Sequence, residues 1–237
     1  MKPYQLKIVA KSLILDNIKL NTIIKTLDGS STVYSKRFNE HYHSTFGAIQ
    51  ESMHVFIESG LQYCNLKSLK IFEIGFGTGL NTFLTLIESI HKNLTVEYTS
   101  IELYPLNIEI INNLNFNELY PTNLYSFFIQ LHSSKWNIKT EINKNFCLLK
   151  LTEDFINYKF TEKYDLIFFD AFAPEKQPEM WSLQNFRKIY NALNHHGILT
   201  TYSSKGIVKK NLREAGFGIT RLKGPAGKRH ILRAEKL

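Results

Sequence analysis

Cysteine is scarce in this 237-residue sequence: Cys64 and Cys147 lie far apart and form no CxxC pair. That scarcity excludes a disulfide framework and a cysteine-based zinc site, and it is typical of a reduced cytoplasmic protein. The chain also lacks a run of eighteen apolar residues, and its first twenty residues do not resemble a signal peptide. We therefore expect a cytoplasmic protein that does not contact a membrane.

Clustered metal ligands are also missing. The histidine pairs His41/His43 and His195/His196 lack a surrounding cluster of cysteine or acidic ligands, so no metal is expected. Acidic residues are fewer than basic ones, 21 against 29, which leaves a formal net charge of +8. This charge fits a polyanionic partner such as RNA. A hydrophobic content of 43% suffices for the core of one domain with a small appendage, and no stable protein partner is predicted.

Glycine is not abundant either, but three of the twelve glycines stand at alternate positions, Gly75, Gly77 and Gly79. The apolar run LKIFEI precedes them and an amphipathic helical pattern, LNTFLTLIESI, follows. Strand, glycine turn and helix form the layout of a nucleotide-binding crevice, where glycines let the backbone approach a ligand closely. A glycine-rich turn without a ligand is the simpler alternative.

The spacing GxGxG, with Glu73 two residues before the first glycine, differs from the GxGxxG of dinucleotide folds. It resembles motif I of the class I S-adenosylmethionine (SAM) methyltransferases. An acid suits the ammonium group of SAM and would repel a pyrophosphate. The resemblance implies that this stretch binds SAM through Glu73, Gly75, Phe76, Gly77, Thr78, Gly79 and Asn81.

The order of the remaining elements predicts an α/β fold. Two or three antiparallel strands before residue 45 form a β appendage, and residues 46–237 form the nucleotide-binding domain. A helix is predicted from Ala48 to Gly60. Strands and helices then alternate to a terminal hairpin around GPAGK, which matches the seven-stranded mixed sheet of Rossmann-like methyltransferases. Residues 115–145 show no sharp period, and a loop with one short helix is expected there.

Acidic residues follow three of the predicted strands. Glu102, about twenty residues beyond the glycine loop, is placed to accept hydrogen bonds from ribose hydroxyls, although an exposed strand-end acid is the alternative. Asp154 either faces an adenine amino group or caps the next turn. Asp170 ends the buried strand YDLIFF, at the edge where ligands bind in open α/β sheets.

The loop after Asp170 is stiffened by Pro174 and Pro178. Such a loop can hold Phe172, Lys176, Met180 and Trp181 over the site. Phe172 and Trp181 either stack on a nucleobase or belong to the core. Basic residues of the 205–213 helix and of the 223–229 loop are candidates for phosphate contacts, in particular Lys209, Lys210, Lys228 and Arg229.

The segments GAIQESMHVF, IGFGTGLNTF, IELYP, DAFAPEKQPEMW and KGPAGKRHIL together resemble the methyltransferase of the MnmC/MnmD family. That family methylates the aminomethyl group of 5-aminomethyl-2-thiouridine at the tRNA wobble position. The resemblance implies tRNA and SAM as substrates, and the stand-alone form without FAD, because the chain stops at Leu237. It also implies that Gln50 and Glu51 face SAM. Ala171 departs from the glycine that many relatives have there.

In this chemistry a primary amine attacks a methyl sulfonium through its free lone pair. Asp170 is the candidate to bind this amine, and either orients it or also accepts its proton. Two alternatives remain: a SAM-dependent methyltransferase of a small amine, since spermidine-synthase-like proteins share this sheet, and a non-catalytic RNA-binding module with a SAM fold. Salt-sensitive tRNA binding would separate the first from a tRNA enzyme.

Overall fold

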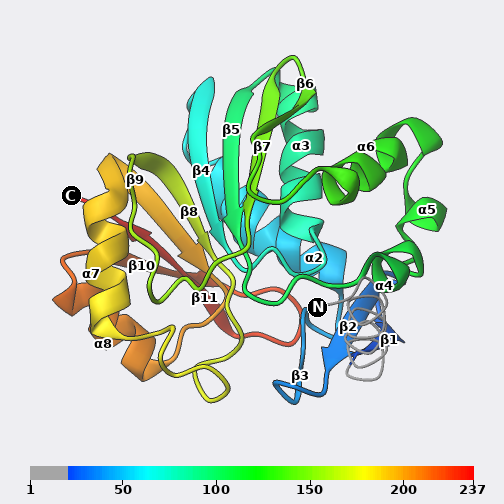
Figure 1. Cartoon of the computed structure of the whole chain (residues 1–237). Helices are drawn as coiled ribbons and strands as arrows, with labels where there is room; N and C mark the ends of the chain where they lie inside the picture. Colours follow the sequence, from blue (N-terminus) through cyan, green and yellow to red (C-terminus); the bar gives the residue numbers. More distant parts are fainter. Residues whose placement is uncertain (1–20) are drawn as a thin grey trace, which may run out of the picture.

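An eight-stranded mixed sheet runs through the middle of the structure (Figure 1), a computed structural model that describes residues 21–237. Its strand order is β10-β11-β9-β8-β4-β5-β7-β6. The strands are β4 (Ser68–Ile74), β5 (Thr95–Ile101), β6 (Thr140–Asn143), β7 (Phe146–Leu151), β8 (Tyr164–Phe169), β9 (Leu193–Thr201), β10 (Gly218–Lys223) and β11 (His230–Glu235).

The five central strands β7, β5, β4, β8 and β9 pair in parallel, and β10 and β11 form the antiparallel hairpin that was predicted at the carboxyl terminus. These are the seven expected strands, and the class I methyltransferase fold is confirmed. The eighth strand, β6, pairs antiparallel with the edge strand β7. It arises from a short polar run, TEIN, whose composition does not signal a strand.

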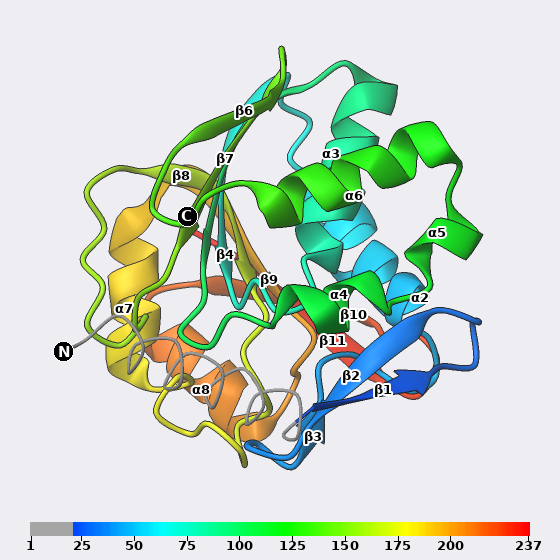
Figure 2. The ribbon, with the colours of Figure 1, turned by 45° about the vertical axis from the view of Figure 1, so that its right-hand side comes forward.

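Helices cover both faces of the sheet. On one face lie α2 (Ala48–Ser52), the π-helix η1 (Met53–Leu61), α3 (Leu80–Lys92) and α6 (Thr122–Ser133); on the other lie α7 (Leu183–Ala192) and α8 (Gly206–Glu214) (Figures 1 and 2). Neighbouring residues of a strand alternate between the two layers. Ile71 and Phe168 belong to the first core cluster, whereas Phe72 and Phe169 belong to the second. Both faces are thus apolar, which explains the nearly continuous hydrophobic runs in the sequence.

A separate three-stranded antiparallel sheet precedes this domain, with β1 (Asn21–Lys25), β2 (Ser31–Ser35) and β3 (Glu40–His41). The predicted strand run from Ile8 lies mostly outside the described residues. The Asn115 side chain joins the appendage to the main domain. Its Nδ2 donates to the Gly29 carbonyl at 2.8 Å and its Oδ1 accepts from Ser31 Oγ at 2.7 Å.

One sequence-based expectation about local structure is wrong. Residues 115–145 are not a loop with one short helix: they form α5 (Phe116–Leu119), the twelve-residue α6 and β6, after α4 (Ile108–Asn112). Only Phe128 and Leu131 of α6 are fully buried, so its helical period is weak. The helix predicted from Ala48 to Gly60 is present as α2 followed by η1, which ends at Leu61, one residue beyond the predicted end. Gly60 sits against Phe168 and Thr200, where an added Cβ would lie 3.1 Å from each.

A buried lysine links α6 to the sheet. Lys150 of β7 is 1% exposed, and its ammonium donates to the carbonyls of Leu131 and His132 at the end of α6, at 2.7 and 3.1 Å. Burial lowers the pKa of Lys150 to about 8. His132 Nε2 in turn donates to the Thr78 carbonyl at 3.1 Å. The carboxyl end of α6 therefore supports the glycine loop.

This arrangement predicts that Lys150→Met destabilises the protein. Methionine fills a similar volume but leaves the His132 carbonyl without its donor, which costs about 1–3 kcal/mol. The Leu131 carbonyl keeps the hydrogen bond from Ser134 Oγ at 2.8 Å. Lys139→Met is the matched control, because Lys139 only pairs with Glu97 at the surface and such pairs contribute about 0.2–1 kcal/mol. Urea unfolding measures both free energies of unfolding. Equal losses in the two variants would show that Lys150 does not cap α6.

Candidate functional site

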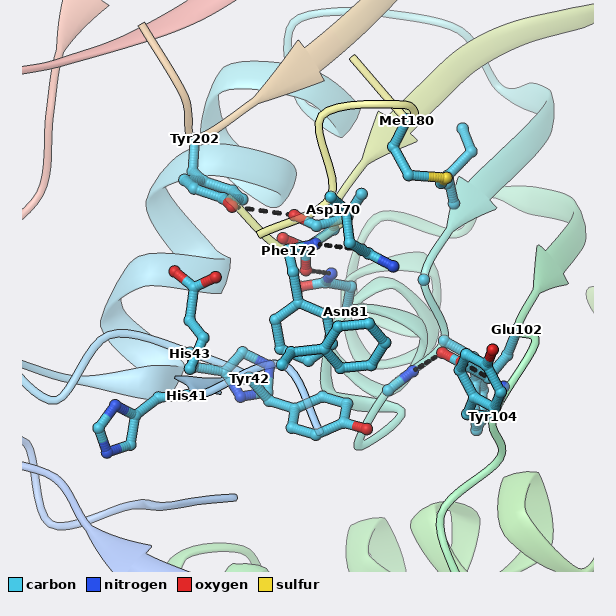
Figure 3. Close-up of a pocket in the computed structure, with 18 of the residues that line it drawn as sticks. His41, Tyr42, His43, Asn81, Glu102, Tyr104, Asp170, Phe172, Met180 and Tyr202 are labelled. Carbon is cyan, nitrogen blue, oxygen red and sulfur yellow. Dashed lines mark hydrogen bonds between the residues drawn. The ribbon is translucent and has the colours of Figure 1, made fainter. Parts of the chain in front are cut away.

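A cavity of about 540 Å³ opens at the carboxyl ends of the parallel strands β4, β5, β7 and β8 (Figure 3). This size lies within the range of small-molecule binding sites. The cavity contains most of the predicted site residues, namely Glu51, Gly75, Phe76, Gly77, Asn81, Glu102, Asp154, Asp170, Phe172, Met180 and Lys228. Parallel strands bring residues that are far apart in sequence to this one edge.

The glycine loop between β4 and α3 forms the floor of the cavity. Gly75 and Gly77 have φ of 94° and 51°, a region that other residues rarely adopt. A Cβ on Gly75 would lie 2.6 Å from the carbonyl oxygen of Asp170, and one on Gly77 would lie 2.9 Å from the Tyr42 ring. Space for a side chain is therefore missing at both positions. Thr78 and Gly79 do not line the cavity; they lie behind the loop, where Gly79 contacts His132.

Glu73 does not face the cavity, contrary to the expectation that it meets a ligand. It points toward α3 on the same strand face as Ile71 and is fully buried. Its Oε2 accepts hydrogen bonds from Ser100 Oγ at 2.6 Å and Thr82 Oγ1 at 3.0 Å. Burial raises the pKa of Glu73 to about 8, although these hydrogen bonds oppose the shift. Glu73 is thus buried behind the glycine loop. A ligand would touch the loop and not Glu73.

Glu102 and Asp154 line the side of the cavity formed by β5 and β7. Glu102 accepts from the backbone N–H groups of Gly77 at 3.1 Å and Tyr104 at 2.8 Å, so it orders the glycine loop and the turn after β5 (Figure 3). Asp154 Oδ1 accepts from the Ile156 N–H at 2.9 Å. Asp154 therefore caps the next turn, one of the two predicted alternatives, and also borders the cavity.

Asp170 stands at the end of β8 with its carboxylate toward the cavity. Asn81 Nδ2, from the first turn of α3, donates to Asp170 Oδ2 at 2.8 Å (Figure 3). Burial raises the pKa of Asp170 to about 7; the Asn81 hydrogen bond and the charge of Lys228 lower it, whereas the charge of Glu51 raises it. A carboxyl group with this pKa changes protonation state near neutral pH, which is the property of a general base.

Lys228 reaches the cavity from the β10–β11 loop instead of facing outward to a phosphate. Its ammonium pairs with the buried Glu51 and lies 4.1 Å from the centre of the Tyr202 ring. Glu51 Oε2 also accepts from the Ser44 N–H at 2.7 Å. The predicted phosphate and cofactor contacts outside the cavity are Gln50, Lys176, Lys209, Lys210 and Arg229. The structure thus divides the predicted basic face into one inward cation and several outer ones.

The two aromatic candidates of the loop after β8 occupy different environments. Phe172 points into the cavity, with Asp170 above it and Tyr42 below in Figure 3. Trp181 is 1% exposed, packs on Phe169 and donates from Nε1 to the Phe172 carbonyl at 2.8 Å. Trp181 is therefore a core residue that holds the loop, which is one of the two predicted alternatives; it does not line the cavity.

Several lining residues escaped the sequence analysis because they come from the appendage and from distant strand ends. They are Phe38, Glu40, His41, Tyr42, His43, Leu103, Tyr104, Gln177 and Tyr202. His43 is fully enclosed, with Nε2 3.5 Å from Thr78 Oγ1, and burial lowers its pKa to about 4. It is therefore neutral near pH 7. In the sequence, the only signal that the appendage contributes to the cavity is the polar EHYH run at residues 40–43, just before the nucleotide-binding domain.

The cavity is acidic although the chain is basic. Seven carboxylic side chains line it against the single lysine Lys228: Glu40, Glu51, Glu102, Glu153, Asp154, Asp170 and Glu179. Such a lining favours a cationic ligand. Within residues 21–237 no group of three or more His, Cys, Asp and Glu residues is arranged to hold a metal ion. None of the helices in that range is long and apolar enough to cross a membrane.

Comparisons with known proteins agree with this geometry. Residues 120–237 match a family model described as S-adenosyl-L-methionine-dependent methyltransferase. The chain is 31% identical over 210 residues to the tRNA 5-methylaminomethyl-2-thiouridine biosynthesis bifunctional protein MnmC of Campylobacter fetus, covering 85% of this chain and 34% of that protein. The corresponding protein of Burkholderia multivorans is 29% identical over 219 residues, covering 86% and 33%. The chain thus spans about a third of the length of these relatives.

Solved structures show the same fold. MnmC2 from Aquifex aeolicus superposes with a TM-score of 0.73 at 24% identity, over 100% of this chain and 78% of that one. Spermidine synthase from Thermotoga maritima superposes with a TM-score of 0.62 at 13% identity, over 92% and 69%.

The burial of Glu73 predicts a measurable pH effect on stability. An unfolded chain ionises this group near 4.5, whereas the folded chain keeps the proton until about pH 8. The stability of the wild type therefore falls, relative to Glu73→Gln, as pH rises from 5 to 8, by up to about 1.4 kcal/mol per pH unit. Urea unfolding at several pH values measures the difference, and ligand affinity should be retained because Glu73 does not line the cavity.

Glu97→Gln on the adjacent strand β5 is the matched control. Glu97 is half-exposed and paired with Lys139, which lowers its pKa, so its contribution to stability is constant between pH 5 and 8. If the free energies of unfolding of Glu73→Gln and the wild type differ by a constant amount over this pH range, Glu73 is not held in its neutral form.

Proposed function

Because the chain is a SAM-dependent methyltransferase homologous to the methyltransferase domain of MnmC, we propose that it methylates the aminomethyl group of 5-aminomethyl-2-thiouridine at the wobble position of tRNA. The MnmC relatives are named for the biosynthesis of 5-methylaminomethyl-2-thiouridine in tRNA, which supports this assignment. The observation that carries it is Asp170, a carboxyl group with a pKa of about 7 beside aromatic rings in an acidic cavity.

The residues of the cavity fit SAM. The glycine loop offers a surface without side chains where a ligand can approach the backbone. Glu102 and Asp154 supply carboxylates for hydroxyl and amino groups, and Asn81 Oδ1 is a buried acceptor that has no hydrogen-bond partner among residues 21–237. When bound, SAM supplies an electrophilic methyl group on a sulfonium. Glu102, Asp154 and the glycine loop would hold it.

Asp170 prepares the acceptor amine. An aminomethyl group is protonated in water and has no free lone pair, so it must lose a proton before it attacks. The carboxylate of Asp170 attracts the ammonium form and accepts a proton more readily than an ordinary aspartate, because its pKa is about 7. Asn81 fixes the orientation of the carboxylate. The surrounding carboxylates add attraction for a cation.

Methylation of a small amine is the second candidate, because an acidic cavity also suits a polyamine. The aromatic rings that line the cavity favour a nucleoside over a polyamine as the substrate. Phe172, Phe38, Tyr42 and Tyr104 provide flat apolar surfaces at the cavity, which stack on a nucleobase and offer little to an aliphatic chain. A net charge of +8 further favours a polyanion. A non-catalytic module would not need a carboxyl group tuned to neutral pH.

The direct test is mass spectrometry of tRNA nucleosides. Transfer RNA carrying 5-aminomethyl-2-thiouridine is incubated with the protein and SAM, then digested, and the methylaminomethyl nucleoside is quantified. We expect its appearance in step with loss of the precursor. Spermidine in place of tRNA tests the second candidate in parallel. Methylated spermidine without methylated tRNA would reject the proposed function.

Replacement of the carboxyl group gives a second prediction. Asp170→Asn retains the shape and the contact with Asn81 but accepts no proton, so single-turnover methyl transfer should fall by about 10²- to 10⁴-fold. SAM affinity by calorimetry should stay within a few fold, because the residues proposed to hold SAM are Glu102, Asp154 and the glycine loop. A variant that turns over near the wild-type rate would refute a role for Asp170 in the reaction.

A further inference from the structure

The turn between β2 and β3, residues 36–39, lies at the mouth of the cavity and carries two cations and an aromatic ring. Lys36 and Arg37 are exposed, and neither has an ion-pair partner among residues 21–237. Several cations of the predicted basic face are paired instead: Lys205 with Glu175, Lys210 with Glu214 and Lys228 with Glu51. Free positive charge is thus available next to the reaction site.

Aromatic rings continue from this turn into the cavity. The Phe38 ring is stacked on Phe172 with centroids 4.3 Å apart and an interplanar angle of 26°. Tyr104, at the end of β5, lies 6.0 Å from Phe38, and the Arg37 guanidinium sits 4.1 Å above the Tyr104 ring. A row of one cation and three rings therefore leads from solvent to the Asp170 side of the cavity.

The two stacked rings differ in how firmly they are held. Phe172 is fixed by hydrogen bonds of its backbone: its N–H donates to Gln177 Oε1 at 3.1 Å and its carbonyl accepts from Trp181. Phe38 belongs to a turn that closes a two-residue strand, β3, with only two paired positions. This turn is held by the Tyr34 hydroxyl, which donates to Asn39 Oδ1, and it is joined to the loop after β8 by Glu40, which accepts from the Ala173 N–H at 3.0 Å. Displacing Phe38 from the stacked pair should thus cost less free energy than displacing Phe172.

Exposed apolar side chains surround the same opening. Phe46, Leu103, Tyr104 and Ile156 line the cavity and are each about 40–50% exposed. Single exposed apolar residues are ordinary, but four around one opening indicate a surface that is covered when a partner binds. Cations beside apolar rings match a single-stranded nucleic acid, whose phosphates and base faces have this combination.

We propose that the β2–β3 turn is the RNA clamp of this enzyme: the target uracil ring enters between Phe38 and Phe172, and Lys36 and Arg37 bind the phosphates beside that nucleotide. This assignment rests on the proposed function and adds the residues that select a nucleotide over a free amine. In the absence of RNA, Phe38 covers the Phe172 ring and keeps it from water. The appendage, whose three strands lie outside the main sheet, thereby provides one wall of the acceptor site.

The first test separates recognition from chemistry. With tRNA carrying 5-aminomethyl-2-thiouridine, Phe38→Ala should raise KM for tRNA about ten- to a hundredfold, the effect expected when a base-stacking ring is removed, with a much smaller change in kcat. Phe38→Tyr keeps a ring and should restore KM to near the wild-type value. SAM affinity should be unchanged in both. An unaltered KM in Phe38→Ala, or a failure of Phe38→Tyr to restore it, would overturn the clamp.

The second test measures the phosphate contacts. Arg37→Ala should reduce the slope of log affinity for tRNA against log salt by roughly one unit, the share of one lost contact. Lys92→Ala is the matched control: Lys92 is exposed and ends α3, at the edge of the sheet opposite the cavity, so the slope should not change. If both variants, or neither, alter the slope, Arg37 does not contact RNA at the cavity.

A binding measurement keeps the clamp testable apart from catalysis. Phe38→Trp adds an indole at the opening, and its fluorescence should be quenched when the thiouridine ring stacks on it; the wild type, with Trp136 and Trp181, supplies the baseline. Quenching without methyl transfer by the wild type would reject the proposed function and retain the clamp. Methyl transfer without additional quenching would reject the clamp and retain the function. Loss of both would reject both.

Discussion

Removal of carboxyl groups from water at one edge of the sheet is the constraint on which this site depends. The parallel strands end at this edge, and burial there raises the pKa of Asp170 to about 7 and that of Glu73 to about 8. Few charges offset the cost: Lys228 is the only lysine or arginine among the described residues that line the cavity. An acidic enclosure of this kind is costly when empty and favourable when a cation enters, so it selects cationic cofactors and amines.

The sequence predicted the fold well because the signals of the sheet are local. Apolar runs, the GxGxG turn and acids after strands each occupy a few consecutive residues, and the strand order follows from alternation of strands and helices. Helix α6 was missed because only Phe128 and Leu131 of it are fully buried. Glu73 was assigned to the ligand from its place in the glycine motif. Both faces of β4 are covered, so the motif alone does not reveal that the side chain points toward α3. Trp181 and Phe172 share one loop, and only tertiary packing distinguishes the core ring from the cavity ring.

The site also depends on residues that lie outside the glycine motif and far from it in the sequence. Lys150 of β7 holds the end of α6, and His132 of α6 holds the Thr78 carbonyl of the glycine loop. From the other side, Tyr42 of the appendage lies against Gly77, and Glu40 holds the loop after β8 through Ala173. The glycine loop is thus enclosed by elements from before and after it in the sequence, which explains why a small β appendage accompanies a complete methyltransferase sheet.

The pH dependence of single-turnover methyl transfer to tRNA tests the role of Asp170 most directly. The rate should rise with pH as Asp170 loses its proton, with a midpoint near 7. In Glu51→Gln the midpoint should move to lower pH, because Glu51 raises the pKa of Asp170 and its loss also leaves the opposing charge of Lys228 unpaired. A midpoint that lies well above 7 and is the same in both proteins would mean that the amine ionises by itself, and would contradict proton transfer to Asp170.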